Sequence, residues 1–184
     1  MEVKMTPLNG MDVAGKRVLL RLDINSPIDP QTKRIVNDNR IKKSLPTLCY
    51  LLDGGAKVAI IAHQGDTLDY QNLIPLKEHA EKLTILSGRE VKYIDDVCGP
   101  AACEAVNALR EGECILLGNL RYLCEEISGF EKEVKLQPCE MLDTWLVRTL
   151  APLFDLYVND AFSAAHRNCP SMTAFQQVLP LSLI

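Results

Sequence analysis

Charged and amide side chains stand directly after several short apolar runs in this sequence. Asp23 and Asn25 follow the first run, His63 the second, Arg121 the fourth and Arg167 the fifth. Guanidinium groups bind carboxylates and phosphates through two parallel hydrogen bonds, and they need no change of protonation to do so. If these side chains meet, the chemistry that they predict is the binding of a small phosphorylated or carboxylated metabolite.

A simpler interpretation of the same pattern is that loops face water and are therefore polar. Spacing alone does not decide between the two interpretations. Neither the P-loop pattern nor the glycine pattern of dinucleotide-binding folds occurs. The glycine pair at 54–55 is better explained as the end of a helix that leads into a strand. The sequence therefore predicts an anion site without a nucleotide cradle.

The elements that must position these residues alternate along the chain. The first predicted helix has apolar residues at helical spacing, Asn39 as its expected N-cap, and Pro46 where it should bend or restart. The predicted strands are 16–24, 57–63, 91–95, 113–121 and 154–160, and the predicted helices are 39–55, 73–88, 99–112 and 139–152.

This alternation predicts an α/β fold, a three-layer α/β/α Rossmann-like arrangement with a parallel sheet and right-handed crossovers. Ligands of such sheets bind outside the carboxyl ends of the strands. The polar residues that follow the strands are therefore expected to meet at one rim.

Composition sets the class of protein. The chain has 184 residues, 47% apolar and 24% charged, which fits a single domain spanning residues 1–184. No apolar run is long enough to cross a bilayer and no signal peptide is evident, so we expect a cytoplasmic protein without a membrane partner. The net charge of −4 and the lack of a basic block argue against nucleic acid. The seven cysteines include no C-x-x-C pair, so neither disulfides nor a metal site are expected.

Several long motifs resemble one family. The stretches are LLRLDINSPID (19–29), NDNRIKKSLPTLCYLLDGGAKVAIIAH (37–63), VKYIDDVCG (91–99), ILLGNLRY (115–122) and VNDAFSAAHR (158–167). In order and spacing, from about residue 15 to 175, they resemble the N-terminal domain of phosphoglycerate kinase. The AHQ tripeptide and the insert around 125–140 are closest to the archaeal-type branch.

The resemblance implies a domain that binds 3-phosphoglycerate. In the family a second, C-terminal domain binds ATP or ADP with Mg²⁺, and hinge closure permits reversible phosphoryl transfer to give 1,3-bisphosphoglycerate in glycolysis and gluconeogenesis. Such a nucleotide-binding domain is expected to be absent from this chain and to act in cis or in trans. We therefore expect the 184 residues alone to bind an anion weakly and to be inactive.

The resemblance also implies individual roles. Arg40 is the expected catalytic residue, near the carboxylate and the migrating phosphoryl group. The phosphate end is assigned to His63, Arg121 and Arg167, while Asp23 and Asn25 would orient the glycerate hydroxyl and carboxylate. From its place in the first strand, Arg21 is expected to support the site through an ion pair.

Two residues depart from the family pattern. The family has a phosphate-binding arginine shortly after the strand-end histidine, where this chain has Asp66. At an effective dielectric constant near 20, two like charges about 4 Å apart repel by about 4 kcal/mol. The family motif E-N-L-R-F begins here with Gly118, which removes a carboxylate. Two alternatives therefore stay open, a non-catalytic anion-binding or interaction module and half of a kinase for a different small acid.

Other polar residues are expected to be structural. We expect His79 on the surface of its helix and His166 as a structural hydrogen-bonding partner. Asn159 and Asp160 are expected to hold the loop that carries Arg167. The charged stretch 124–138 is expected to be a surface excursion.

Overall fold

The computed structural model describes residues 5–8 and 10–183. Within these residues the chain forms one sheet of seven strands in the order β1-β7-β6-β2-β3-β5-β4, and all neighbouring pairs are parallel. The strands are β1 (Met5–Pro7), β2 (Arg17–Leu22), β3 (Lys57–Ile61), β4 (Val91–Tyr93), β5 (Cys114–Leu116), β6 (Leu156–Asp160) and β7 (Leu181–Leu183).

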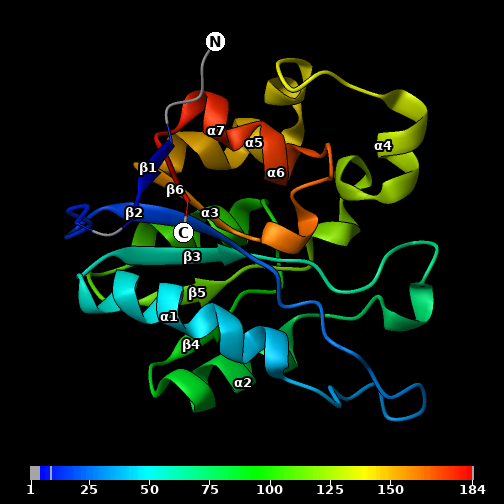
Figure 1. Ribbon diagram of the computed structural model, residues 1–184, viewed down its shortest axis with the longest axis horizontal. Coiled ribbons are helices and arrows are strands. Elements are labelled where there is room, and N and C mark those ends of the chain that lie inside the picture. The colour runs from blue at the N-terminus through cyan, green and yellow to red at the C-terminus, as the bar shows by residue number, and fades with distance from the viewer. Residues whose placement is uncertain (1–4, 9, 184) are drawn as a thin grey trace.

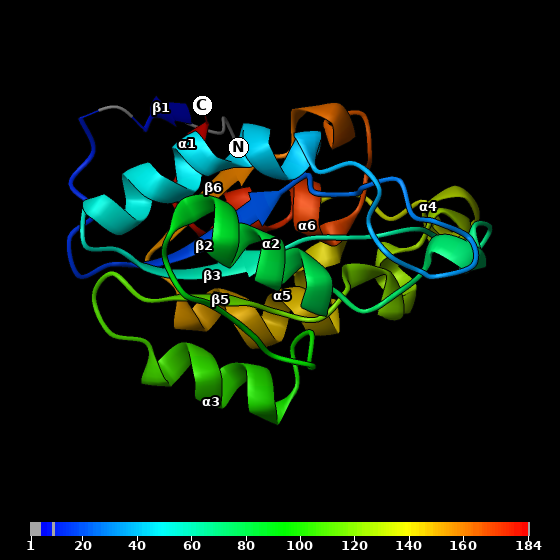
Figure 2. The ribbon, with the colours of Figure 1, turned by 90° about the horizontal axis from the view of Figure 1, so that it is seen from below.

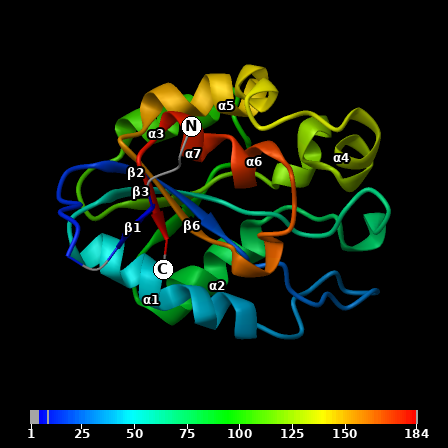
Figure 3. The same ribbon diagram turned by 45° about the horizontal axis from the view of Figure 1, so that its top comes forward.

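Helices cover both faces of this sheet, as Figure 3 shows. One face carries α1 (Asn39–Asp53) and α2 (Lys77–Ser87). The other carries α3 (Pro100–Ala108), α5 (Trp145–Leu150), α6 (Pro170–Thr173) and α7 (Phe175–Val178). Short 3-10 turns are η1 (Tyr70–Asn72), η2 (Leu120–Tyr122), η3 (Cys124–Glu126), η4 (Glu140–Asp143), η5 (Ala151–Leu153) and η6 (Phe162–Ala164). The predicted three-layer α/β/α fold is confirmed.

The alternation of side chains along each strand divides the core in two. In β2, Leu20 belongs to the cluster beneath α1 and α2, whereas Leu19 belongs to the cluster beneath α3 and α5. Successive strand residues point to opposite faces, so Arg21 shares the side of Leu19. His63 likewise follows Ile61 on that side. The register of the sheet therefore places Arg21 and His63 on one face at the carboxyl ends of adjacent strands.

Several predicted boundaries were wrong. The sheet gains β1 and β7, three-residue strands that are too short to give a sequence pattern. The helix predicted at 139–152 is three short pieces, η4, α5 and η5, because Thr144 is extended and Pro152 lies near the end. Helix α2 starts at Lys77, after Pro75, instead of at 73. Helix α1 continues through Pro46 without a restart, and its N-cap is Asp38 instead of Asn39.

The excursion before α5 contains η3 and α4 (Ser128–Val134). Figures 1 and 2 show α4 beside the loop that follows β3, at the end of the molecule to which the strand arrows point. A hydrogen bond between Ser128 and Asp66 joins the two segments. Among the described residues, no helix is long and apolar enough to cross a membrane.

Candidate anion site at the carboxyl edge of the sheet

The site lies where neighbouring strands send the chain to opposite faces of the sheet. After β3 the chain passes to the α2 face, whereas after β5 it passes to the α5 face. Such a divergence opens a crevice beyond the carboxyl ends of parallel strands. His63 follows β3 and Arg121 follows β5, so these two residues flank this crevice.

Arg21 and His63 form the buried centre of the site. Only 2% of Arg21 and 8% of His63 are exposed. Nη2 of Arg21 lies 2.9 Å from Nδ1 of His63, and the same guanidinium donates to the Leu22 carbonyl and to Oγ of Ser171. Arginine has only donors, so Nδ1 accepts and a neutral His63 carries its proton on Nε2. The ion pair predicted for Arg21 does not occur among the described residues, and Arg21 contacts His63 through a hydrogen bond instead.

Arg121 lies in the same buried layer. Its Nη1 donates to the carbonyl of Glu126 and lies 3.6 Å from Oδ2 of Asp66. Its Nε is buried and has no partner among the described residues. Burial and the charge of Arg167 lower the pKa of Arg121, which remains far above neutrality as a guanidinium.

Arg167 is held by the excursion. Nε of Arg167 donates to Oε2 of Glu131 in α4, and the backbone N–H of Asn168 donates to Oε1 of the same carboxylate at 2.7 Å. Nη2 of Arg167 is buried without a partner in the described part of the chain. The guanidinium thus keeps a free donor after its ion pair is made.

Arg40 and Asp23 form a more open end of the site. Nη1 of Arg40 donates to Oδ2 of Asp23 and to Oγ of Ser163, which also bonds Asp23. About half of the Arg40 side chain is exposed. These three residues line a hollow of about 350 Å³ together with Lys43, Ser44, Asp160 and Phe162. Asn25 accepts a hydrogen bond from the backbone of Gly65, which connects it to the loop after β3.

The pKa of His63 depends on burial and on the charges of four arginines. Burial lowers the pKa of His63 well below its usual value, and the charges of Arg21, Arg121, Arg167 and Arg40 lower it further. Four guanidinium groups from distant parts of the sequence therefore act on one imidazole. The structure brings the predicted residues Arg40, His63, Arg121 and Arg167 together, and it connects Asp23 and Asn25 to the same rim through Arg40 and Gly65.

A network of buried amides supports the site and was not found from the sequence. The side-chain oxygen of Gln64 accepts a hydrogen bond from the backbone N–H of Ser26 and lies within hydrogen-bond distance of Nε2 of His79. The backbone of Gln64 both donates to and accepts from the side-chain amide of Asn119. Asn119 also accepts from the backbone N–H of Arg121. The prediction that His79 lies on the surface was wrong, because this side chain is fully buried in the network.

Glu126 is the second group that sequence reasoning missed. Its carboxylate is 1% exposed and accepts from both the backbone N–H and the hydroxyl of Ser171. Burial raises the pKa of Glu126, while the charges of Arg21 and Arg121 oppose that shift. The only signal in the sequence was a pair of glutamates in the predicted surface excursion.

The remaining polar residues are structural or peripheral. Asp96 bonds two backbone N–H groups at the start of α3. Asn159 bonds its own loop as predicted, but Asp160 instead accepts from Thr47 on α1. His166 is exposed and makes no hydrogen bond among the described residues, so its predicted structural role was wrong. At Gly118 an added Cβ would lie 3.1 Å from the backbone of Asp96 and from the side chain of Val97, so the backbone here is closely packed.

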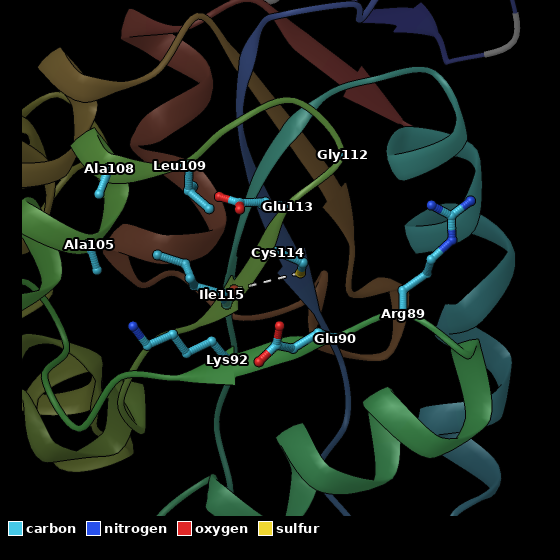
Figure 4. Close-up of a pocket in the computed structure, with 10 residues that line it drawn as sticks. All are labelled: Arg89, Glu90, Lys92, Ala105, Ala108, Leu109, Gly112, Glu113, Cys114 and Ile115. Atoms are coloured by element: carbon cyan, nitrogen blue, oxygen red, sulfur yellow. Dashed lines mark hydrogen bonds between the residues drawn. The ribbon is translucent and has the colours of Figure 1, made fainter.

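A larger hollow of about 450 Å³ lies at the opposite, amino-terminal edge of β4 and β5 (Figure 4). Its charged groups do not converge. Glu113 accepts a backbone hydrogen bond from Arg110, and Arg89 reaches away to Asp53 on α1. No cluster of three or more His, Cys, Asp or Glu that could hold a metal occurs in the described residues.

Comparisons with known proteins agree with this geometry. The family model described as phosphoglycerate kinase matches residues 8–184. The phosphoglycerate kinase of Sulfurisphaera tokodaii is 42% identical over 97% of this chain, and the match covers 41% of that protein. The phosphoglycerate kinase of Thermococcus kodakarensis is 44% identical over 91% of this chain, and the match covers 38% of that protein.

Solved structures show the same likeness. The crystal structure of the phosphoglycerate kinase from Pyrococcus horikoshii OT3 superposes with a TM-score of 0.89 at 37% identity, covering 97% of this chain and 42% of that one. The structure of the phosphoglycerate kinase from Coxiella burnetii superposes with a TM-score of 0.75 at 26% identity, and the match covers 98% of this chain and 41% of that one. The chain spans about two fifths of the length of these relatives, and the archaeal sources agree with the predicted branch. With its fold, its rim of arginines and these matches, the chain belongs to the phosphoglycerate kinase family.

Proposed function

We propose that this chain is the acid-binding half of a phosphoglycerate kinase. The reaction is reversible phosphoryl transfer between ATP and the carboxylate of 3-phosphoglycerate. The observation that carries the proposal is the buried His63, which is bonded to Arg21 and whose pKa is lowered by burial and by the charges of Arg21, Arg121, Arg167 and Arg40. A phosphorylated acid with two charged ends needs such a set of donors.

In this proposal the two ends of the rim have different tasks. Arg121, Arg167 and Nε2–H of His63 bind the phosphate of the acid, and Asn25 and Asp23 orient its hydroxyl and carboxylate. Arg40 is half exposed and faces the open hollow, so it is placed to stabilise charge on the transferred phosphoryl group. Catalysis of such transfers depends mainly on positioning and on charge stabilisation.

The nucleotide and its Mg²⁺ do not fit the described residues of this half. Asp23 and Asp160 line the same hollow, but Asp23 is engaged by Arg40 and Asp160 by Thr47. The proposal assigns ATP or ADP to a second domain, joined in cis or supplied in trans, and the reaction to the cytoplasm. This half then binds the acid, orients it and helps to exclude water on closure.

Titration of the 184-residue chain with 3-phosphoglycerate tests binding. The side-chain NMR signals of Arg40, Arg121, Arg167 and His63 are expected to shift together at millimolar ligand. Unchanged signals at these residues would overturn the proposal. Adding a nucleotide-binding domain of a relative in trans then tests catalysis through the formation of ADP.

A second candidate is a half that binds a different small acid, or binds without catalysis. The observation that favours it is the ion pair between Asp66 and Arg121, which places an anion where the family has a cation. If 3-phosphoglycerate fails to bind while an unphosphorylated hydroxy acid shifts Arg40 and Asn25, this candidate replaces the first.

A further inference from the structure

Two of the arginines at the rim already hold a carboxylate of this chain. Arg121 pairs with Asp66 through atoms 3.6 Å apart, and Arg167 pairs with Glu131. The side chains of all four residues are less than a fifth exposed. Ion pairs this well shielded from solvent are screened less than surface pairs.

Helix α4 holds both carboxylates. Oγ of Ser128 donates to Oδ2 of Asp66 at 2.5 Å, and Glu131 stands three residues later on the same helix. Residues three apart lie on the same side of a helix. Figures 1 and 2 show this helix beside the loop after β3, which carries Asp66. A single short helix therefore connects the two arginines to their counter-ions.

The environment keeps both carboxylates ionised. Burial acts to raise the pKa of Asp66, but the hydrogen bond from Ser128 and the charge of Arg121 outweigh it. Burial acts likewise on Glu131, and the N–H of Asn168 and the guanidinium of Arg167 outweigh it in the same way. Each arginine still has a buried N–H without a partner in the described residues, Nε in Arg121 and Nη2 in Arg167.

We propose that Asp66 and Glu131 act as internal counter-anions that compete with phosphate for Arg121 and Arg167 and so lower the affinity of the rim for phosphorylated acids. A phosphate that reaches these guanidinium groups must displace the carboxylates or bind beside them, and both outcomes oppose binding. The unpartnered N–H groups are buried, so they become donors only to an anion that displaces the carboxylates. This proposal rests on the proposed function, because it assigns the phosphate to that end of the site.

The experiment uses the 184-residue chain with inorganic phosphate and 3-phosphoglycerate as probes. Asp66→Asn and Glu131→Gln remove each charge while keeping a side chain that can accept the hydrogen bonds of Ser128 and Asn168. Glu133→Gln is the matched control, since Glu133 is exposed on the same helix and makes no ion pair among the described residues.

We expect the double variant to bind both probes about tenfold more tightly and each single variant several-fold more tightly, since tenfold corresponds to about 1.4 kcal/mol. The control should stay within about twofold, because it only changes net charge at a distance. The Nε–H signals of Arg121 and Arg167 should also move in the variants without ligand, which reports the lost pairs independently of binding.

The outcomes separate the two proposals. If the original chain binds 3-phosphoglycerate but the double variant binds no more tightly than Glu133→Gln, the counter-anion proposal is wrong and the proposed function stands. If neither the original chain nor the double variant binds either probe at millimolar concentration, both are wrong. Thermal unfolding of each variant distinguishes loss of fold from loss of binding, and a single variant that stays folded still decides the question.

Discussion

The two edges of the sheet differ in what their charged groups contact. At the carboxyl edge Arg21, His63 and Glu126 are buried. Arg21 bonds His63, and both Arg21 and Glu126 bond Ser171. At the amino edge Lys92 and Glu113 are exposed around a larger hollow, and they face water. Charges removed from water must find partners or cost stability, whereas exposed charges carry no such requirement. The proposed site therefore differs from the larger hollow in having buried charges that contact one another, whereas the size of a hollow does not distinguish it.

The largest expected effect in this comparison comes from Glu126. Replacement by Ala removes a carboxylate whose pKa burial raises and the charges of Arg21 and Arg121 lower, and it removes two hydrogen bonds from Ser171. We expect the free energy of unfolding to fall by about 4 kcal/mol, as measured by urea denaturation. Glu133→Ala, on an exposed position, should change it by less than about 0.5 kcal/mol. Equal effects of the two substitutions would contradict the proposed contrast between buried and exposed charge.

The second effect is a dependence of stability on pH that the carboxyl edge alone should cause. Burial lowers the pKa of His79 to about 4, and it also lowers the pKa of His63 well below its usual value. The unfolded chain takes up protons near pH 6.5, so the unfolded state binds more protons than the folded state below that pH. Stability is therefore complete above about pH 6.5 and falls as the pH drops toward 4.

For His79 the full difference in pKa corresponds to about 3 kcal/mol, of which about 2 kcal/mol is lost by pH 5. Urea denaturation at about pH 7.5 and about pH 5 measures this loss. His79→Asn, which keeps a donor for Gln64, should reduce the loss, while His166→Asn on the exposed position should not. A loss that persists unchanged in His79→Asn would show that other groups are responsible.

The third effect concerns binding at the open end of the rim. Arg40→Lys keeps the charge but loses the planar fork that bonds an anion at two points, so we expect about tenfold weaker binding of 3-phosphoglycerate. Because the Arg40 side chain is half exposed, the melting temperature of the Arg40→Lys variant should differ little from that of the original chain. Lys42→Met, on the same helix, provides the control, because Lys42 pairs with Asp38 and with no other acidic group in the described part of the chain. Calorimetric titration measures the affinity of both variants for 3-phosphoglycerate. If Arg40→Lys binds as tightly as Lys42→Met, Arg40 is not part of the binding site.

The smallest effect is expected at the amino edge. Lys92→Ala removes an exposed charge from the 450 Å³ hollow of Figure 4. We expect a change in stability below about 0.5 kcal/mol and no change in the affinity for 3-phosphoglycerate beyond about twofold. A loss of binding comparable to that of Arg40→Lys would mean that the ligand binds at the amino edge of the sheet instead of the carboxyl edge.

Much of the fold followed from periodicity. Short apolar runs alternating with helical spacing led to the parallel three-layer arrangement and to the strands that the structure forms as β2 to β6. The boundaries failed where local signals were weak or were overridden by tertiary contacts. Three-residue strands such as β1 and β7 have no pattern of their own, and Pro46 sits in an intact helix because α1 packs along the sheet.

Parts of the site could also be read before the fold was known. Residue types at the strand ends and at the start of the first helix predicted that Arg40, His63, Arg121 and Arg167 share one rim, because parallel strands end at a common edge. Residue type could not identify Glu126 or Glu131, which lie in an irregular charged stretch. Their importance depends on the groups that they meet in the fold. Arg167 is 36 residues from Glu131, and Ser171 is 45 residues from Glu126.

The sequence by itself determined the class of fold, the edge at which chemistry is expected and the positive groups available there, since these follow from local pattern and residue type. Only the tertiary structure decided how those charges are balanced. In the folded chain His79 is buried, Asp66 pairs with Arg121, and Glu131 pairs with Arg167. Arg21 forms a hydrogen bond with His63. The reason is physical, because burial and pairing depend on distances between segments that no local pattern specifies.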